Sequence, residues 1–441
     1  MTILLMIVVN LRALTISRIT QHKFSLCITK NFTMKKSMLF GNTAADPRTN
    51  SSKKNTLKLL ILKELYQNGC KSIPELSKII HMSTPTITRA IDELIESEFL
   101  AEEGIGSSSG GRRPNLYGLN PPARYVLGVD ISRNHIRLGL FNFNNQPVVD
   151  IKVIDEGLEI SKDFMKSLKT AVNDFIKESG IDEKKLMGIG IALPGLIDLH
   201  TGISYSYLQD EKPATIQFEN IFDYPVFVEN DTKVMALGEQ AFGMAQGKQN
   251  VLCLNIGSGI GLGMILNGKL YKGNSGFSGE FGHIQVDPDG QLCYCGKIGC
   301  LETLASGTTM IKRAKKEISE GATTVIRTMV SDDISKITIE TVLKAAQHGD
   351  QFAIGLLANI GEHLGRGIAV LIHLFNPELI IIGGELTKAE NYIVDPIQQN
   401  LNKFTIAKIR RDAQIMTSNL GQNAGLMGTV ALVMNKVFQK E

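Results

Sequence analysis

The chain has no tryptophan, only six cysteines among 441 residues, and 6% aromatic residues. Six cysteines are too few to build a fold of this length from disulfides, so a reducing cytoplasm is the expected compartment. No run of about 18 apolar residues is present, which excludes a membrane-spanning helix and argues against a membrane partner. With 43% apolar residues, the chain is expected to form about three core-forming units.

The net charge of +3 is small, but it is unevenly spread. The first 124 residues hold 17 Lys and Arg against 9 Asp and Glu, whereas the remainder holds 30 against 35. Positive charge is therefore concentrated at the front. Residues 1–55 are treated as an unassigned tail: the apolar run Ile3–Val9 is too short and lacks the flanks of a secretion signal, and Met34, before two lysines, is a plausible start.

Three short helices are predicted near the front. The first begins near Thr56. Ser72-Ile-Pro-Glu75 is a capping box for the second, because the Ser72 hydroxyl can accept from the Glu75 amide while Glu75 reaches back. Thr84 is expected to cap the third. The apolar stripes are Leu57, Leu60, Ile61 and Leu65; then Ile73, Leu76 and Ile80; and then Ile87, Ile91, Leu94 and Ile95.

The opposite face of the third helix offers hydroxyls and a guanidinium, which suit DNA phosphates and base edges. These residues are Thr84, Thr86, Thr88 and Arg89. A glycine-serine tip, Gly104–Gly111, is followed by Arg112 and Arg113, as in a β-hairpin wing whose arginines enter a minor groove. The segment is thus predicted to be a winged helix-turn-helix that binds double-stranded DNA. The alternative is a three-helix protein-binding module with a flexible loop.

From Tyr125 onward the pattern alternates between strands and helices. Gly128-Val-Asp130-Ile and Leu254-Asn-Ile-Gly257 begin two similar strand-turn-strand units, which predicts an α/β body of two like lobes with a cleft between them. The expected strands are Tyr125–Ile131, His135–Asn142, Val148–Ile154, Leu186–Leu193, Val251–Ile256, Gly261–Leu266 and Leu379–Ile382, and the main helices are Ser161–Ser179, Gln351–Phe375 and one from about Asn423.

Two segments between the lobes carry candidate chemistry. Glu229-Asn230-Asp231 stands where a strand ends and a helix starts, a position that commonly faces a ligand in open α/β sheets. An Asp there can accept a proton from a hydroxyl nucleophile, but an N-cap explains the residues equally well. Gly257-Ser-Gly259-Ile-Gly261 can present backbone amides to a phosphate, and a tight hairpin explains its glycines as well.

A third segment predicts a metal site. His283, Cys293, Cys295 and Cys300 supply an imidazole and three thiolates, the ligand set of a closed tetrahedral zinc centre. A closed centre leaves no position for water, so the zinc is expected to be structural. Glu280 and Glu302 are natural companions of this site. Reduced core cysteines beside an unrelated histidine are the alternative.

The segment Gly279-Glu-Phe-Gly-His283 to Cys293-x-Cys295-x4-Cys300-Leu-Glu302 resembles the zinc signature of the ROK family of repressors, open reading frames and sugar kinases. The resemblance covers about residues 56–441 and implies a two-lobed actin-like (ribonuclease H-like) fold. In the family's kinases, sugar hydroxyls are held by residues that match Asn230, Asp231, Glu280, His283 and Glu302, with the Asp as general base. The Gly-Gly-Arg-Arg-Pro wing is similar to that of the family's repressors of xylose and N-acetylglucosamine operons.

One turn departs from the kinase pattern. The kinases carry Asp-x-Gly-Gly-Thr-Lys, whereas this chain has Asp130-Ile-Ser-Arg-Asn-His135. A phosphate can approach backbone amides closely only where bulk is absent, so ATP binding is expected to be weakened or lost. The alternative is that Arg133 supplies compensating charge.

These features predict a cytoplasmic, sugar-responsive repressor with structural zinc, a sugar or sugar-phosphate effector, and a homodimeric or homotetrameric state. The expected division is a winged helix-turn-helix at 56–121 and a ROK sugar-binding domain at 122–441, in lobes of about 122–245 and 246–441. One alternative is a kinase that uses ATP and magnesium with Asp231 as its base, and another is a protein adaptor that does not bind DNA.

Overall fold

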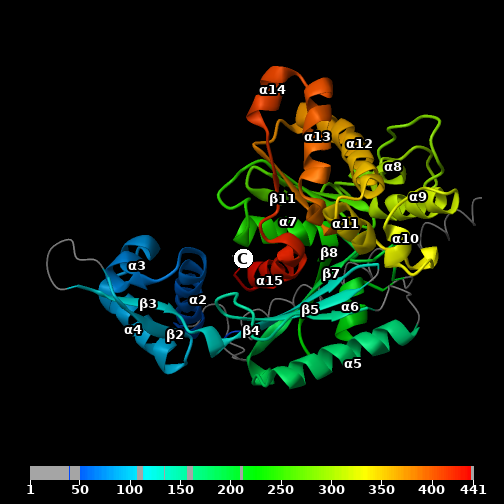
Figure 1. The fold of residues 1–441 in the computed structure, drawn as a ribbon. Coiled ribbons are helices and arrows are strands. Elements are labelled where there is room, and N and C mark those ends of the chain that lie inside the picture. The colour runs from blue at the N-terminus through cyan, green and yellow to red at the C-terminus, as the bar shows by residue number, and fades with distance from the viewer. Residues whose placement is uncertain are drawn as a thin grey trace, which may run out of the picture.

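The computed structural model describes residues 39, 50–106, 113–133, 135–155, 162–208 and 212–438. These residues form a head and a two-lobed body, each lobe built around its own sheet. In Figure 1 the head, in blue and cyan, lies to one side of the body. Within the described residues, no helix is long and apolar enough to cross a membrane.

The head contains three helices and a three-stranded sheet in the order β1-β3-β2. Its elements are α2 (Asn50–Asn68), β1 (Lys71–Ser72), α3 (Ile73–Ile80), α4 (Thr84–Glu96), β2 (Leu100–Ile105) and β3 (Asn115–Leu119). The antiparallel pair of β2 and β3 is the predicted wing, and β1 extends it. Helix α2 begins at Asn50 and not at the expected Thr56.

The predicted capping box of α3 is present. The Ser72 amide donates to Glu75 Oε2 at 2.8 Å, and the Glu75 amide donates to Ser72 Oγ at 3.5 Å. The cap expected at Thr84 is wrong: Ser83 is the N-cap of α4, because its carbonyl accepts the first helical bond, from the Thr86 amide at 2.9 Å. The head core is formed by Ile61, Leu62, Leu65, Leu76, Ile87, Ile91 and Leu94, whereas Leu57, Leu60, Ile73, Ile80 and Ile95 are half-buried.

The two sheets of the body have the same topology. Each begins with an antiparallel meander of three strands and adds two parallel strands beside the first. The first sheet, β6-β5-β4-β7-β8, is formed by β4 (Tyr125–Ile131), β5 (Ile136–Asn142), β6 (Lys152–Ile154), β7 (Leu186–Leu193) and β8 (Val226–Asn230). The second, β11-β10-β9-β12-β13, is formed by β9 (Val251–Ile256), β10 (Ile260–Leu266), β11 (Lys269–Tyr271), β12 (Leu379–Gly383) and β13 (Gln414–Thr417). The prediction of two like lobes is confirmed.

Helices α7 (Asp231–Phe242) and α15 (Ala424–Phe438) lie between the two sheets (Figure 1). They pack closely, because a Cβ on Gly428 would lie 1.9 Å from the Val234 carbonyl oxygen. Although α15 falls within the expected second lobe, it packs on β4 and β7 of the first sheet. The other helices are α5 (Lys162–Ser179), α6 (Ala214–Glu219), α8 (Glu302–Ala305), α9 (Gly307–Ser319), α10 (Ile326–Met329), α11 (Ile339–Gln347), α12 (Gln351–Phe375), α13 (Asn391–Phe404) and α14 (Ala407–Asp412).

Head and body share one apolar cluster, in which Leu62 and Leu65 of α2 meet Val437 and Phe438 of α15. The ring centroids of Tyr66 and Phe438 are 5.2 Å apart, and the Tyr66 hydroxyl donates to Asn145 Oδ1 at 2.7 Å. Burial raises the pKa of Tyr66 well above its ordinary value. The head is therefore packed directly onto the first lobe.

Little of the expected tail is described. Leu39 is buried, and its carbonyl accepts a hydrogen bond of 2.6 Å from Arg124. Residues 1–38 and 40–49 lie outside the described part of the chain.

Candidate ligand cleft, metal centre and DNA-binding face

The turn from β8 into α7 positions two of the predicted ligand residues. Asn230 caps α7, since its Oδ1 accepts from the Lys233 amide at 3.1 Å, and its Nδ2 donates to Asp231 Oδ1 at 3.0 Å. Asp231 is the first residue of the helix and also accepts from the Thr232 amide at 2.7 Å. The cap is therefore Asn230, which orients the carboxylate beside it.

A cavity of about 250 Å³ opens beside this turn, with lining residues from both lobes. The structure brings together at this cavity all five residues that the resemblance implies for sugar binding: Asn230, Asp231, Glu280, His283 and Glu302. The volume lies just below the roughly 300–1,000 Å³ of typical small-molecule pockets, which suits a monosaccharide.

Of the carboxylates at the cavity, Glu302 is buried, Asp231 is half-buried and Glu280 is exposed, and hydrogen bonds hold Asp231 and Glu302. Burial raises the pKa of Asp231, while the hydrogen bonds from Thr232 and the charges of Lys233 and Arg133 oppose the rise. Burial also raises the pKa of Glu280. Oriented acceptors of this kind suit the hydroxyl donors of a sugar.

In the glycine loop between β9 and β10, close packing against Glu302 explains why residue 259 is a glycine. A Cβ on Gly259 would lie 2.7 Å from Glu302 Oε2, and that same oxygen accepts from the Ile260 amide at 2.9 Å. The Gly257 amide donates to the Gly259 carbonyl at 3.0 Å, as in a tight hairpin. The loop thus holds the Glu302 carboxylate in position. The predicted role of the loop's backbone amides in binding a phosphate stays a prediction.

The turn between β4 and β5 carries side chains where the kinase pattern has glycines. Arg133 lines the cavity; its Nε donates to the Tyr207 hydroxyl at 2.9 Å, and its guanidinium carbon lies 5.2 Å from the centroid of the Tyr294 ring. The Ser132 hydroxyl donates to the His135 carbonyl at 2.8 Å, which closes the turn. Asn134 lies outside the described residues. Arg133 therefore stands where the kinase pattern has a glycine, and the expected loss of ATP binding stays a prediction.

The four predicted metal ligands converge in the second lobe. The candidate ligand atoms of His283, Cys293, Cys295 and Cys300 all lie within 4.8 Å of one another. Cys293 Sγ is 3.6 Å from His283 Nδ1, and the Sγ atoms of Cys295 and Cys300 are 3.6 Å apart. Zinc bonds of about 2.0–2.3 Å in a tetrahedron require ligand separations close to these. The described cysteines are all free of disulfides.

The second nitrogen of His283 is turned away from the thiols. His283 Nε2 lies 3.2 Å from the Tyr294 hydroxyl, and Tyr294 also lines the cavity. Sequence reasoning did not single out Tyr294 or Tyr207. The position of Tyr294 between two predicted ligand cysteines was the available signal.

The predicted DNA-binding residues of α4 lie on its exposed or half-exposed face. Thr84 and Arg89 are exposed, whereas Thr86 and Thr88 are half-buried and already hydrogen-bonded: Thr86 Oγ1 is 2.8 Å from Ser83 Oγ, and Thr88 donates to the Thr84 carbonyl at 2.9 Å. A phosphate or base edge would compete with these local bonds.

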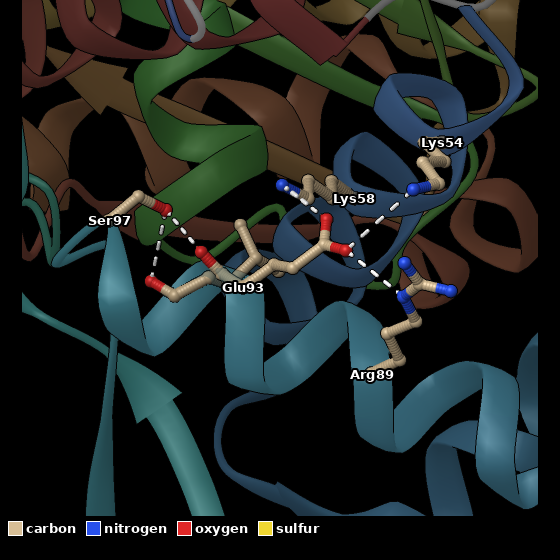
Figure 2. Close-up of polar contacts among 6 residues, drawn as sticks. Lys54, Lys58, Arg89, Glu93 and Ser97 are labelled. Atoms are coloured by element: carbon tan, nitrogen blue, oxygen red, sulfur yellow. Dashed lines mark hydrogen bonds and ion pairs between the residues drawn. The ribbon is translucent and has the colours of Figure 1, made fainter. Parts of the chain in front are cut away.

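Figure 2 shows a charge cluster on this face that sequence reasoning missed. Glu93 of α4 pairs with Arg89 at 3.4 Å, with Lys58 at 2.9 Å and with Lys54 at 4.0 Å. One carboxylate therefore holds three cations from two helices. In the wing, Arg113 is exposed, while Arg112 and the rest of 107–112 lie outside the described residues.

Two family models match the chain: that of the ROK family over residues 126–436 and that of the MarR family over residues 55–103. A MarR-type winged-helix head joined to an actin-like sugar-kinase fold is the class of protein that these features define. The chain belongs to the ROK family.

Several relatives are similar along most of their length. The xylose repressor of Caldicellulosiruptor bescii is 28% identical over 86% of this chain and 96% of its own. The transcriptional dual regulator NagC of Escherichia coli K12 is 30% identical over 82% and 87%. The crystal structure of a ROK family transcriptional regulator, a homologue of the E. coli MLC protein, has a TM-score of 0.70 at 28% identity over 88% and 97%. A ROK family glucokinase from Streptomyces griseus, solved with glucose and AMPPNP, has a TM-score of 0.62 at 28% identity over 70% and 98%.

Proposed function

We propose that this protein is a sugar-responsive transcriptional repressor whose head binds operator DNA and whose cleft binds the effector. One observation carries the proposal: the five sugar-type residues lie together at the cavity, while Arg133 stands in the turn where the kinase pattern has a glycine. Its relatives among the xylose and N-acetylglucosamine repressors support it.

In this proposal, the head, at about 56–121, contacts DNA through two elements. Helix α4 enters the major groove with Thr84, Thr86, Thr88 and Arg89, and the wing reaches the minor groove with Arg112 and Arg113. A homodimer or homotetramer of such chains reads an inverted repeat, with half-sites set by the separation of the heads.

The ligand domain, at about 122–441, holds the sugar between its lobes. Asn230, Asp231, Glu280 and Glu302 accept hydrogen bonds from sugar hydroxyls or donate to them. His283 binds structural zinc through Nδ1, together with the three cysteines, and its Nε2 then faces the ligand once Tyr294 moves aside. When bound, the metal fixes this loop and the imidazole ring.

Coupling between the sites requires the sugar to bind two arrangements with unequal affinity, typically by about 1 to 3 kcal/mol. Helix α15 suits this role, because its first residues line the cavity beside Asp231 and its last residue, Phe438, contacts Tyr66 of the head. Lobe closure would therefore change the surface on which the head rests.

The rival is an ATP- and magnesium-dependent sugar kinase with an appended head. The retained Asp231, half-buried at the cavity and oriented by Asn230, is the observation that favours it. A coupled assay with hexoses and amino sugars discriminates between the two: robust phosphorylation that is lost in Asp231→Asn would overturn the repressor proposal.

The proposed DNA contacts are tested with duplexes that the purified protein selects from a randomised library. Arg112→Ala with Arg113→Ala should lower the affinity about tenfold or more at low salt and make its salt dependence shallower, because two phosphate-neutralising charges are lost. Zinc, measured by elemental analysis, should remain at about one equivalent per chain. Unchanged DNA binding would contradict the wing assignment, and a wild type without zinc would contradict the metal assignment.

A further inference from the structure

The end of the second lobe around α14 carries exposed apolar side chains from three neighbouring segments. They lie on α12, at the end of α13 and just before α14, and are called the α14 patch: Val370, Leu374, Phe404 and Ile406. Leu374 is 70% exposed and Ile406 is 61% exposed. In Figure 1, α14 lies at the top of the body, away from the head. These side chains therefore face solvent within the described part of the chain.

Two contacts show that the α14 patch is one surface. The guanidinium carbon of Arg366, on α12, lies 5.4 Å from the centroid of the Phe404 ring. The amide of Ile406 donates to His373 Nε2 at 3.1 Å, and His373 is the neighbour of Leu374 on α12. A contiguous group of exposed apolar side chains, unlike scattered ones, marks a binding surface for another macromolecule.

The surroundings of the α14 patch are basic. The segment 403–411 contains no carboxylate. Four exposed cations border the patch: Lys403, Lys408, Arg411 and Arg366. None of these four side chains forms an ion pair within the described residues, although Glu362 lies one turn before Arg366 and Asp412 follows Arg411. Positive charge therefore exceeds negative charge around the apolar side chains.

This charge distinguishes among the partners that an apolar patch can take. A twofold contact between two copies of the chain would bring cations onto cations near its axis, which is unfavourable. A lipid surface takes helices whose apolar side chains follow one face, whereas this patch combines the ends of two helices and the link after them. DNA phosphates match the cations but not Leu374 and Ile406. A protein segment with apolar side chains flanked by carboxylates complements both features.

We propose that the α14 patch binds an acidic, amphipathic segment of another protein. Its apolar side chains pack on Leu374 and Ile406, and its carboxylates pair with Lys408 and Arg411. None of these residues lines the cavity between the lobes. The partner can therefore hold the protein without occupying the ligand cleft or the DNA-binding face of the head. The inference goes beyond the proposed function and does not depend on it.

The experiment is selection of peptides from a random library displayed on phage, with the full-length protein as bait. Enriched peptides should combine Asp or Glu with Leu or Phe, and synthetic copies should bind more weakly as salt is added, because the flanking charges are exposed. Two double variants, Leu374→Ser with Ile406→Ser and Lys408→Glu with Arg411→Glu, should each weaken binding about tenfold or more.

Two matched controls should leave peptide binding unchanged. Val325→Ser with Met329→Ser removes exposed apolar side chains near and on α10. Lys166→Glu with Lys169→Glu reverses two exposed charges on α5 that have the same spacing as Lys408 and Arg411. Circular dichroism checks that all four variants are folded.

Several results would overturn the inference. Enriched peptides that are basic or neutral, binding that persists in both patch variants, or the absence of enriched peptides would each do so. Loss of the oligomer in Leu374→Ser with Ile406→Ser, seen by sedimentation velocity, would assign the patch to a second copy. Flotation of the wild type, but not of this variant, with phosphatidylcholine and phosphatidylglycerol vesicles would assign it to a lipid surface. Weaker DNA binding by Lys408→Glu with Arg411→Glu would assign the cations to DNA.

Discussion

Gly259 leaves room at the cavity for the Glu302 carboxylate. The glycine has no Cβ, so the Glu302 carboxylate can approach the loop and accept the Ile260 amide. Gly257, in the same loop, has no atom closer than 3.8 Å to the Cβ it would carry. Packing therefore requires a glycine at position 259 but leaves space for a Cβ at position 257.

Gly259→Ala should destabilise the fold by about 1 to 3 kcal/mol, because the added methyl displaces a buried carboxylate. Denaturant unfolding measures this loss. Gly257→Ala is the matched control, and its free energy of unfolding should change by less than about 0.5 kcal/mol. Equal losses in the two variants would show that the loop backbone, and not Glu302, sets the requirement.

Asp130 makes stability depend on pH. Burial raises its pKa to about 6 from 3.8; the charge of Arg137 opposes the rise and that of Asp231 adds to it. Between these two values the folded state binds more protons than the unfolded state, so stability falls as pH rises, and the full loss is reached above the folded pKa.

Asp130→Asn should therefore stabilise the protein by up to about 3 kcal/mol near neutral pH and much less near pH 4. Denaturant unfolding at both pH values checks the difference. Asp332→Asn, at an exposed surface position, is the control and should show little change at either pH. A benefit of Asp130→Asn that grew on acidification would contradict the assignment.

At the scale of elements, α2 and α4 are joined by the charge cluster of Figure 2. Glu93 neutralises part of the positive charge beside the face of α4 that is proposed to contact DNA, since Lys54, Lys58 and Arg89 all pair with it. Lys54 and Arg89 are largely solvent-exposed, so their pairs with Glu93 contribute little to stability, whereas the side chain of Lys58 is only 16% exposed.

Glu93→Gln should raise the affinity for a random-sequence duplex several-fold and steepen its salt dependence, because the exposed Lys54 and Arg89 become available to phosphates. Fluorescence anisotropy with a labelled duplex at two salt concentrations measures both effects. Glu317→Gln, which breaks a similar pair with Arg313 on α9, is the control and should change neither. A weaker affinity in Glu93→Gln would mean that the cluster positions α4 for DNA.

Elements that are rich in apolar residues and lie between clear stops were predictable from sequence. Tyr125–Ile131, Leu186–Leu193 and Gln351–Phe375 form with the expected bounds. The expected strand Val148–Ile154 was predicted too long; only Lys152–Ile154 is a strand, because the chain bends at Val148 and Val149 after an isolated bridge between Phe141 and Pro147. Local patterns indicate apolar content but not where a sheet partner begins.

The site was predictable to a similar extent. Ligand spacing and family resemblance placed His283 and the cysteines together, since short spacings limit how far the chain can separate them. The contacts of Arg133 with Tyr207 and Tyr294 were not predictable, because they join three distant loops through long side chains. The same applies to α15, whose return to the first sheet is a property of the whole topology.

At the scale of the whole molecule, the cleft and the head are connected through packed helices. Asp231 begins α7, α7 packs on α15, and Phe438 at the end of α15 packs on Tyr66. Such a path shows contact but not coupling, which requires a measured effect of one site on the other.

Phe438→Ala should leave sugar affinity within about twofold. It should reduce the change in DNA affinity that the sugar causes, because the ring contact between Phe438 of the body and Tyr66 of the head is lost. Titrations of sugar, and of selected DNA with and without sugar, measure the two effects. Tyr66→Phe, which removes only the hydroxyl bond to Asn145, is a milder second variant, and Phe404→Ala on α13 is the control. A full response in both head-contact variants would exclude this route.

Contact between Lys63 and the carbonyl of Phe438 joins residues 375 positions apart. The chain leaves the ribosome from its N-terminus, and domains generally fold in that order. The apolar side of α2 therefore has no α15 to cover it until translation has passed the last helix. A nascent chain that carries a finished head still lacks the surface on which that head comes to rest.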